Sequence, residues 1–209
     1  MVLPQSPEKL RRHITEHLDT LPGSAKRSIG DLLEHASNIE DRLLEYDRAL
    51  TEIACEDARS KRLMQLRGVG PTTASAVLTS IGAGHDFRNG RQVAASIGLT
   101  PGQYSSSGKA RLGSIAKAGA AYLRGLLVND ARAVIANLGE KQDRFSRWVR
   151  TLVERRGYWR AAIAIASKNA RMAWAVLKYG DDFKWSCRST TTRGEKELHA
   201  AALTLGRRM

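Results

Sequence analysis

The chain has 209 residues, of which 34 are Lys or Arg and 21 are Asp or Glu, giving a net charge of +13. This excess of positive charge favours a polyanionic partner, a nucleic acid first and an anionic membrane surface second. The absence of an 18-residue apolar run and of an apolar leader near Met1 argues against a membrane span and a secretory signal. Only Cys55 and Cys187 occur, which argues against a disulfide scaffold or a zinc site and fits a reducing cytoplasm.

The first 57 residues are predicted to form a short helix and a long helical linker. Residues 5–20 have the pattern of an amphipathic helix that ends before Leu21-Pro22-Gly23. From Ser24, apolar residues recur at alternating spacings of three and four, which is a heptad pattern. Residues 24–57 have four basic and nine acidic residues, so this segment is not the expected nucleic-acid surface. The pattern fits either a coiled coil between subunits or an antiparallel hairpin with residues 5–20. The apolar positions are Ile29, Leu32, Ala36, Ile39, Leu43, Tyr46, Leu50 and Ile53.

The charge reverses after residue 57, and the polyanion should therefore meet the following region. Residues 58–137 have 11 basic and two acidic residues, and residues 138–178 have ten basic and three acidic. Helical periodicity covers 71–82, 91–98, 114–138, 142–156 and 160–178, and few runs alternate, so no β-sheet is expected. The predicted fold is all-α: a long coiled-coil helix (1–57), a compact helical domain (58–183) and a flexible tail (184–209).

Residues 63–82, LMQLRGVGPTTASAVLTSIG, have the pattern of a helix–hairpin–helix. Gly68 and Gly70 permit a tight turn with positive φ, and Pro71 suits the first position of the next helix. Unpaired N–H groups at that helix start can bind a phosphate, which holds a nucleic-acid backbone without reading its bases. The alternative is a tight turn between packed helices that has no ligand.

A glycine- and serine-rich loop, residues 99–113, follows. A serine hydroxyl in it could act as a nucleophile if its charge were stabilised, and Lys109 and Arg111 could hold a scissile phosphate. The alternative is a solvated loop that binds phosphate through hydroxyl and N–H groups. The candidate nucleophiles are Ser105, Ser106 and Ser107, and the candidate nucleic-acid-binding residues are Gly108, Lys109 and Arg111.

The last two predicted helices add cations and aromatic rings. Trp148, Trp159 and Trp174 could stack on bases, although tryptophans at helical spacing more often anchor a core. No pair or triad of Asp and Glu lies in the basic region, so a self-contained two-metal site is not expected, and no residue is assigned to a metal. The phosphate-contacting candidates from these helices and their flanks are Lys117, Arg124, Lys168 and Arg171.

At these residues the chain resembles a known family. The run from Leu63 through FRNGRQVAASIGLTPGQYSSSGKARLGSIAKAGAAYLRGLLVNDARAVI, continued by the segment from Trp148 to Trp174, is similar to the C-terminal domain of insertion-sequence 110 transposases, in the insertion-sequence 1111 branch. The heptad segment is similar to that family's coiled-coil linker. The resemblance covers roughly residues 5–183.

The resemblance implies a DNA recombinase that moves an insertion sequence site-specifically under the guidance of a structured bridge RNA. In this family the helical domain supplies a serine nucleophile to a site shared with an N-terminal acidic, resolvase-like domain that binds Mg²⁺. Aligned on the family's Tyr-Ser-Ser-Gly-Gly-Lys, Ser106 is the expected nucleophile, with Ser107 second and Ser105 third, because Ser107 stands where the family has a glycine. The family's Lys-Arg-Gly is Lys117-Ala118-Gly119 here, which removes one phosphate contact.

The acidic domain is absent from these 209 residues, so the sequence predicts the DNA-binding C-terminal part of a transposase, inactive alone, with Mg²⁺ needed only with that domain. DNA, a bridge RNA and a second copy or a full-length transposase are the expected partners, in a bacterial cytoplasm near the nucleoid. A non-catalytic, oligomeric nucleic-acid-binding module that modulates the full-length enzyme is the alternative, and a host repair factor is a third reading.

Overall fold

The computed structural model describes residues 6–103 and 112–180, which fall in two units, Met1–Asp57 and Ala58–Met209. The expectation of an all-α fold is confirmed in its main feature, because helices dominate and only two short strands accompany them. Within the described residues, no helix combines the length and the apolar character that a membrane crossing requires.

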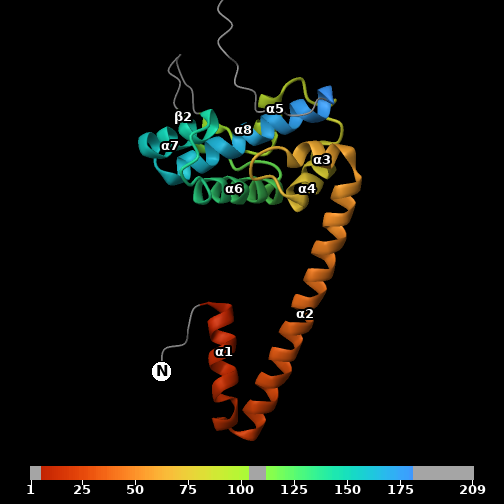
Figure 1. Cartoon of the computed structure of the whole chain (residues 1–209), viewed down its shortest axis with the longest axis vertical. Helices are drawn as coiled ribbons and strands as arrows, with labels where there is room; N and C mark the ends of the chain where they lie inside the picture. The colour runs from red at the N-terminus through yellow and green to blue at the C-terminus, as the bar shows by residue number, and fades with distance from the viewer. Residues whose placement is uncertain (1–5, 104–111, 181–209) are drawn as a thin grey trace, which may run out of the picture. The chain divides into compact units, whose positions relative to one another are not determined.

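The first unit consists of α1 (Pro7–His17), a 3-10 turn η1 (Leu18–Thr20) and α2 (Gly23–Glu56) (Figure 1). α1 runs antiparallel beside the first part of α2, and Arg11 donates to a Glu40 carboxylate oxygen at 2.6 Å. At 1.5 Å per residue, the 11 residues of α1 span only about a third of the 34 residues of α2.

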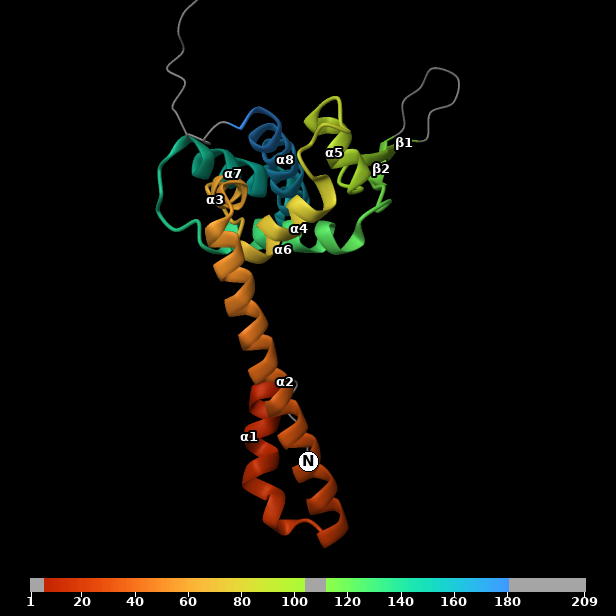
Figure 2. The ribbon, with the colours of Figure 1, turned by 90° about the vertical axis from the view of Figure 1, so that its right-hand side faces the viewer.

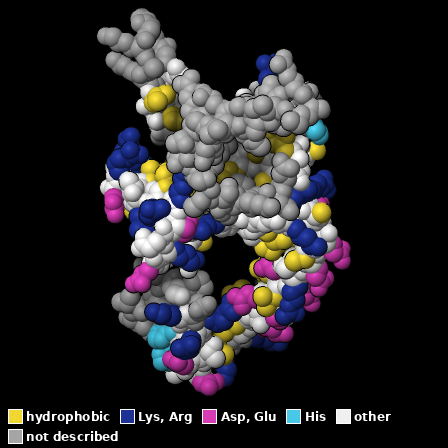
Figure 3. Space-filling model, turned by 45° about the horizontal axis from the view of Figure 1, so that its top comes forward, with side chains coloured by type: hydrophobic (Ala, Val, Ile, Leu, Met, Phe, Trp, Pro, Cys, Tyr) yellow, Lys and Arg dark blue, Asp and Glu magenta, His cyan; other side chains and the backbone are white. Residues whose placement is uncertain are grey.

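Much of the heptad stripe of α2 remains exposed. Leu43 and Tyr46 are 56% and 61% exposed, and Figure 3 shows hydrophobic side chains on this helix among acidic ones. The hairpin with α1 and an outward-facing stripe are therefore compatible features of the same unit, because α1 leaves these apolar side chains exposed. The exposed members of the stripe are Leu32, Ile39, Leu43, Tyr46 and Ile53.

The second unit is built around α8 (Tyr158–Tyr179), which contacts α3 (Ala58–Met64), α5 (Gly90–Ser96), α6 (Ala121–Ala136) and α7 (Arg144–Arg156) (Figure 2). α4 (Pro71–Ile81) packs on α3 and α6. The alanines of α8 let the neighbouring helices approach closely, and Ala162, Ala166 and Ala170 are fully buried. The core also contains Leu63, Leu66, Val77, Val93, Leu123, Leu127, Val149 and Ile165.

The helix ends follow local sequence. Pro71 stands in the first turn of α4, and the Asp143 carboxylate accepts from the N–H groups of Phe145 and Ser146 at the start of α7. Gly157, at φ +79°, separates α7 from α8, and Gly180 ends α8 in the left-handed conformation. The expected helices at 71–82, 91–98, 142–156 and 160–178 are confirmed within a few residues.

The expectation that the chain contains no β-sheet is wrong. β1 (Pro101–Gln103) and β2 (Leu112–Ile115) form an antiparallel ribbon, with Pro101 opposite Ile115 and Gln103 opposite Leu112. Most residues of both strands are exposed, so no apolar alternation signals the ribbon in the sequence. Because residues 112–115 form β2, the helix expected from residue 114 begins only at Ala121.

Candidate nucleic-acid interface

The two-stranded ribbon joins the serine-rich segment to the helical unit. Beyond the strands, the Ala116 N–H donates to Thr100 O at 2.9 Å and the Lys117 N–H donates to Gly98 O at 3.2 Å. The chain therefore leaves and re-enters the helical unit along paired segments. The residues between the strands lie outside the described part of the chain; they include Ser105, Ser106, Ser107, Gly108, Lys109 and Arg111.

Residues 96–98 and 117–119 form the foot of the ribbon, and two glycines let these two segments cross closely. Gly98 and Gly119 both have φ of +76°. A Cβ at Gly98 would lie 2.3 Å from Ala118 O, and one at Gly119 would lie 1.8 Å from Ser96 O. Neither position has room for a side chain, so the close crossing depends on glycine at both.

Arg124 of α6 ties these two segments to the helices. Its Nη1 donates to Ile97 O at 2.8 Å and to Ala118 O at 3.1 Å. The sequence predicts that Arg124 orients a phosphate, whereas the structure gives its guanidinium a positioning task at the foot of the ribbon. Lys117, beside this contact, is exposed and has a positive φ of 54°, an uncommon conformation for a residue with a side chain.

The turn between α3 and α4 lies at the opposite end of the unit from the ribbon (Figures 1 and 2). Gly68 has the expected positive φ, 86°, and a Cβ there would lie 2.8 Å from Asp130 O of α6. Gly70, however, is extended, with φ −95° and ψ 178°, so the expectation of positive φ holds for Gly68 alone. No side chain of the described residues caps α4, and its first N–H groups follow Gly70 directly.

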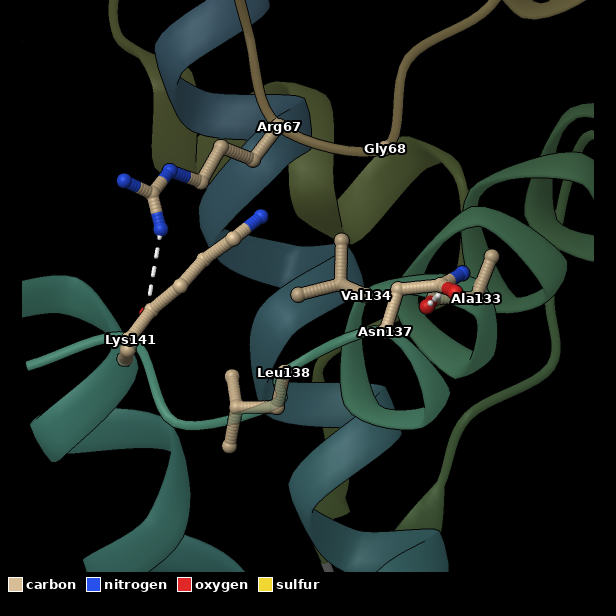
Figure 4. A pocket seen from close by; sticks show the side chains of 8 residues that line it. Arg67, Gly68, Ala133, Val134, Asn137, Leu138 and Lys141 are labelled. Atoms are coloured by element: carbon tan, nitrogen blue, oxygen red, sulfur yellow. Dashed lines mark hydrogen bonds between the residues drawn. The ribbon is translucent and has the colours of Figure 1, made fainter.

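A cleft of about 390 Å³ opens beside this turn (Figure 4). Arg67 and Lys141 supply its positive charge, and Val134 and Leu138 line it with apolar surface. Arg67 is held in place, because its Nη1 donates to the Asp143 carboxylate and the Ser146 hydroxyl, each at 3.1 Å. The Ser146 hydroxyl also donates to Asp143 Oδ1 at 2.6 Å. This hydrogen bond contributes most to lowering the pKa of Asp143 to about 2, and the hydrogen bonds from Arg67 and from the Ser146 N–H lower it further.

Asn169 of α8 holds the same turn in place, although nothing in the sequence pattern around it predicts this contact. Its side chain is fully buried, and Nδ2 donates to Arg67 O at 3.0 Å. A buried polar residue within an alanine-rich helix is the signal that could have identified the residue, though not its partner, because such a group is retained where it satisfies a backbone partner.

Asp130 lies between α6 and α4, and its carboxyl group accepts a hydrogen bond from Thr73. Its Oδ2 has no hydrogen-bond partner among the described residues. Burial raises the pKa of Asp130 to about 6, because the charged form is poorly solvated there. The ionised carboxylate is therefore a source of instability at neutral pH.

We expect Asp130→Asn to stabilise the chain at pH 7 by about 1 kcal/mol, a figure reduced for solvent screening of this partly exposed group. Because the folded pKa is raised, the wild type should lose stability as the pH rises from about 4 to 6, whereas the variant should not. Urea denaturation of both proteins at pH 4 and pH 7 measures the difference. Equal stability of the two proteins at pH 7 would contradict this account.

Lys168 and Arg171 of α8 line a second cleft, of about 510 Å³, with Trp148. Lys168 Nζ lies 4.3 Å from the Trp148 ring centroid. Burial lowers the pKa of Lys168, and the charges of Arg171 and Arg144 lower it further. A bound anion would relieve the repulsion among Lys168, Arg171 and Arg144, so this cleft favours a phosphate.

The predicted phosphate-contacting residues therefore lie in separate places. Lys117 and Arg124 lie at the foot of the ribbon, Gly68 lies beside the Arg67 cleft, and Lys168 and Arg171 share the cleft lined by Trp148. A ligand that contacts all of them must be extended, as a nucleic-acid backbone is. Within the described residues, no three His, Cys, Asp or Glu side chains come together to hold a metal ion.

Comparison with known proteins identifies the family. Residues 60–147 match the family described as "Transposase IS116/IS110/IS902 family". The chain is 42% identical over 157 residues to a "Probable family 20 transposase" of Pseudomonas aeruginosa, an alignment that covers 75% of this chain and 46% of the relative. It is 37% identical over 159 residues to the "Transposase for insertion sequence element IS1111A" of Coxiella burnetii, with 76% and 44% covered.

A third relative is the "Transposase for insertion sequence element IS1328" of Yersinia enterocolitica, 35% identical over 163 residues that cover 78% of this chain and 49% of the relative. These likenesses first define a class, the transposases of insertion sequences. Within that class, residues 60–147 of the chain are a domain of the IS116/IS110/IS902 family. It spans about half the length of the curated relatives that it matches.

Proposed function

We propose that this chain is the DNA-binding, serine-bearing part of a site-specific DNA recombinase that catalyses transposition. The observation that carries the proposal is the ribbon foot, where Arg124, Gly98 and Gly119 hold both ends of the serine-rich segment against the helices. A nucleophile must be presented at a defined position, and a braced ribbon can provide one. Family membership supplies the reaction, DNA transposition.

Within this proposal, Ser106 is the nucleophile, with Ser107 and Ser105 as the second and third candidates. Its hydroxyl oxygen attacks a DNA phosphorus, the bond from phosphorus to the leaving 3′ or 5′ oxygen breaks, and that oxygen takes up a proton. Lys109, Arg111 and Lys117 would neutralise the charge on the phosphoryl oxygens. Mg²⁺ would be held by an acidic domain supplied with this chain, and a structured RNA would select the target.

The DNA backbone would follow the separated clefts. Gly68 and Gly70 would present the α4 N–H groups to one phosphate, as in a helix–hairpin–helix, while Lys168 and Arg171 would contact another. The α3–α4 arrangement, with an uncapped α4 after a glycine turn, supports this assignment.

A covalent-adduct assay tests the proposed reaction. The chain is mixed with Mg²⁺, labelled element-end DNA and the adjoining non-coding RNA, with and without a supplied acidic domain, and run on a denaturing gel. We expect labelled protein that disappears in Ser106→Ala. An adduct that survives alanine at Ser105, Ser106 and Ser107 together would refute a serine nucleophile in this segment.

A second candidate function is a non-catalytic module that oligomerises through residues 29–53 and modulates a full-length transposase. The exposed apolar stripe of α2 supports it, because an uncovered stripe on a long helix favours a partner helix. An outcome with no adduct but with salt-sensitive DNA binding would favour this candidate.

We expect Leu43→Glu to lower the oligomeric state of the chain, since it places a charge within the apolar seam. Leu43 is 56% exposed, so the single chain should keep its fold. Light scattering after size-exclusion chromatography measures the mass, and circular dichroism confirms the helix content. Arg42→Glu, a charge reversal next to the seam, is the control. An unchanged mass for Leu43→Glu would contradict a seam through residues 29–53.

A further inference from the structure

A cleft of about 480 Å³ at the foot of the ribbon combines cations with flat and apolar surface. Its volume lies within the range of about 300–1,000 Å³ of small-molecule sites. None of the described residues that line it is acidic. Its cationic, aromatic and branched apolar lining residues include Ile115, Lys117, Arg124, Val128, Arg132 and Trp159.

Trp159 differs from the other tryptophans of this unit. Trp174 is buried, and its Nε1 donates to Gly84 O at 3.0 Å, whereas Trp148 is half-buried beneath Lys168. Trp159 is 63% exposed, although it stands in the first turn of the central helix α8. The general expectation that these tryptophans anchor the core is therefore wrong for Trp159. Its ring contacts Arg132 and, edge to face, Tyr158, and most of its surface is open to solvent.

A second flat group is positioned against this ring. The Arg132 guanidinium carbon lies 5.4 Å from the Trp159 ring centroid, within the distance of a cation–π contact. Arg132 Nη1 also donates to Asn129 Oδ1 at 3.4 Å, which restricts its rotation from within α6. The cleft thus presents an indole and a guanidinium whose arrangement exists before any ligand binds, and Lys117 adds a positive charge beside them.

This combination fits a nucleotide whose base is unpaired. Indole and guanidinium planes both stack on nucleobases, and the nearby cations suit the attached phosphate. A base inside a duplex has both faces covered by its neighbours, so only an extruded base could enter such a cleft. The apolar side chains of Ile115 and Val128, which also line the cleft, would shield the base from water.

We propose that the Arg132–Trp159 cleft binds one extruded base of a DNA strand. The proposal rests on the function proposed above, and it adds a base-binding subsite to a surface otherwise assigned to phosphates. The position supports DNA as the strand concerned. Ile115 lies three residues beyond Leu112, where the serine-rich segment rejoins the ribbon, and three strand residues span about 10 Å, or roughly three nucleotide steps.

The test uses the whole chain and a set of duplexes of one sequence: fully paired DNA, DNA with one bulged adenine, and DNA with an abasic bulge. Fluorescence anisotropy gives the dissociation constants. We expect the wild type to bind the bulged adenine about tenfold more tightly than the abasic bulge, a typical stacking contribution. Trp159→Ala should remove this ratio and leave binding to paired DNA unchanged, and Trp159→Phe should restore part of it.

The matched control is Tyr122→Ala, which removes another exposed aromatic ring, one that does not line the cleft. It should keep the tenfold ratio. A ratio that persists in Trp159→Ala, or that Tyr122→Ala also removes, overturns the proposal. A larger ratio between the bulged adenine and the abasic bulge in the equivalent RNA than in DNA also overturns it. Equal wild-type binding to all the DNAs defeats this inference alone, whereas no DNA binding at all defeats the proposed function as well.

Discussion

Replacing Gly119 by alanine is expected to destabilise the ribbon foot by at least about 3 kcal/mol. The φ of +76° alone costs an alanine about 1–2 kcal/mol. The new Cβ would also lie 1.8 Å from Ser96 O, a backbone atom that can move only if the crossing opens. Because the Ala116 and Lys117 N–H groups are hydrogen-bonded just above this crossing, they should lose protection first.

Chemical denaturation measures the stability change, and hydrogen exchange at Ala116 and Lys117 localises it. The matched control is Gly125→Ala in the middle of α6, where an added Cβ meets nothing within 4 Å. That substitution should stabilise the chain by about 0.5–1 kcal/mol, because alanine favours a helix interior. A Gly119→Ala protein within about 0.5 kcal/mol of the wild type would show that the crossing can relax.

Asn169→Asp should cost about 3–4 kcal/mol at pH 7. The substitution keeps the shape of the side chain, but in this fully buried position only a protonated carboxyl can replace the amide as the donor to Arg67 O. The folded protein avoids a buried charge by keeping the new carboxyl protonated, which raises its pKa well above the unfolded value of about 3.9. The cost should therefore vanish below about pH 4 and grow as the pH rises.

Urea titrations of the variant and the wild type at pH 4 and pH 7 separate this effect from a general loss of packing. The control is Asn137→Asp, at an exposed asparagine that caps the C-terminal end of α6 and whose amide donates to Ala133 O. It should cost less than about 1 kcal/mol at either pH. A pH-independent loss in Asn169→Asp would show that the contact to Arg67 O contributes little.

The sequence predicts the helices of the second unit well, because their apolar periodicity and their glycine and proline boundaries are local signals. The ribbon escaped prediction, since its short strands have little buried surface to produce a period-two pattern. The need for glycine at positions 98 and 119 was not predicted either, because it too has no local signal in the sequence. Their necessity arises from a crossing between segments about twenty residues apart, and one sequence does not show which segments meet.

The candidate site was predicted less completely than the fold. The cations at Lys117, Lys168 and Arg171 were identified from charge alone, and the structure places them in basic clefts. Charge could not show that Arg124 is already hydrogen-bonded to backbone carbonyls, nor that Trp159 faces solvent whereas Trp174 is buried. Those distinctions depend on the side of α6 and α8 that each residue occupies relative to the core.

The central position of α8 bears on how the protein folds during synthesis. The family match ends at residue 147, within α7, and so does not include α8. Nevertheless α3, α5, α6 and α7 all pack on α8, which begins at Tyr158 and is therefore made after all of them. At ribosomal rates of about 5–20 residues per second, the earlier helices wait for seconds before α8 is made. Their apolar faces are open to chaperones during that interval. The helical unit should therefore acquire its native structure late and in one cooperative step.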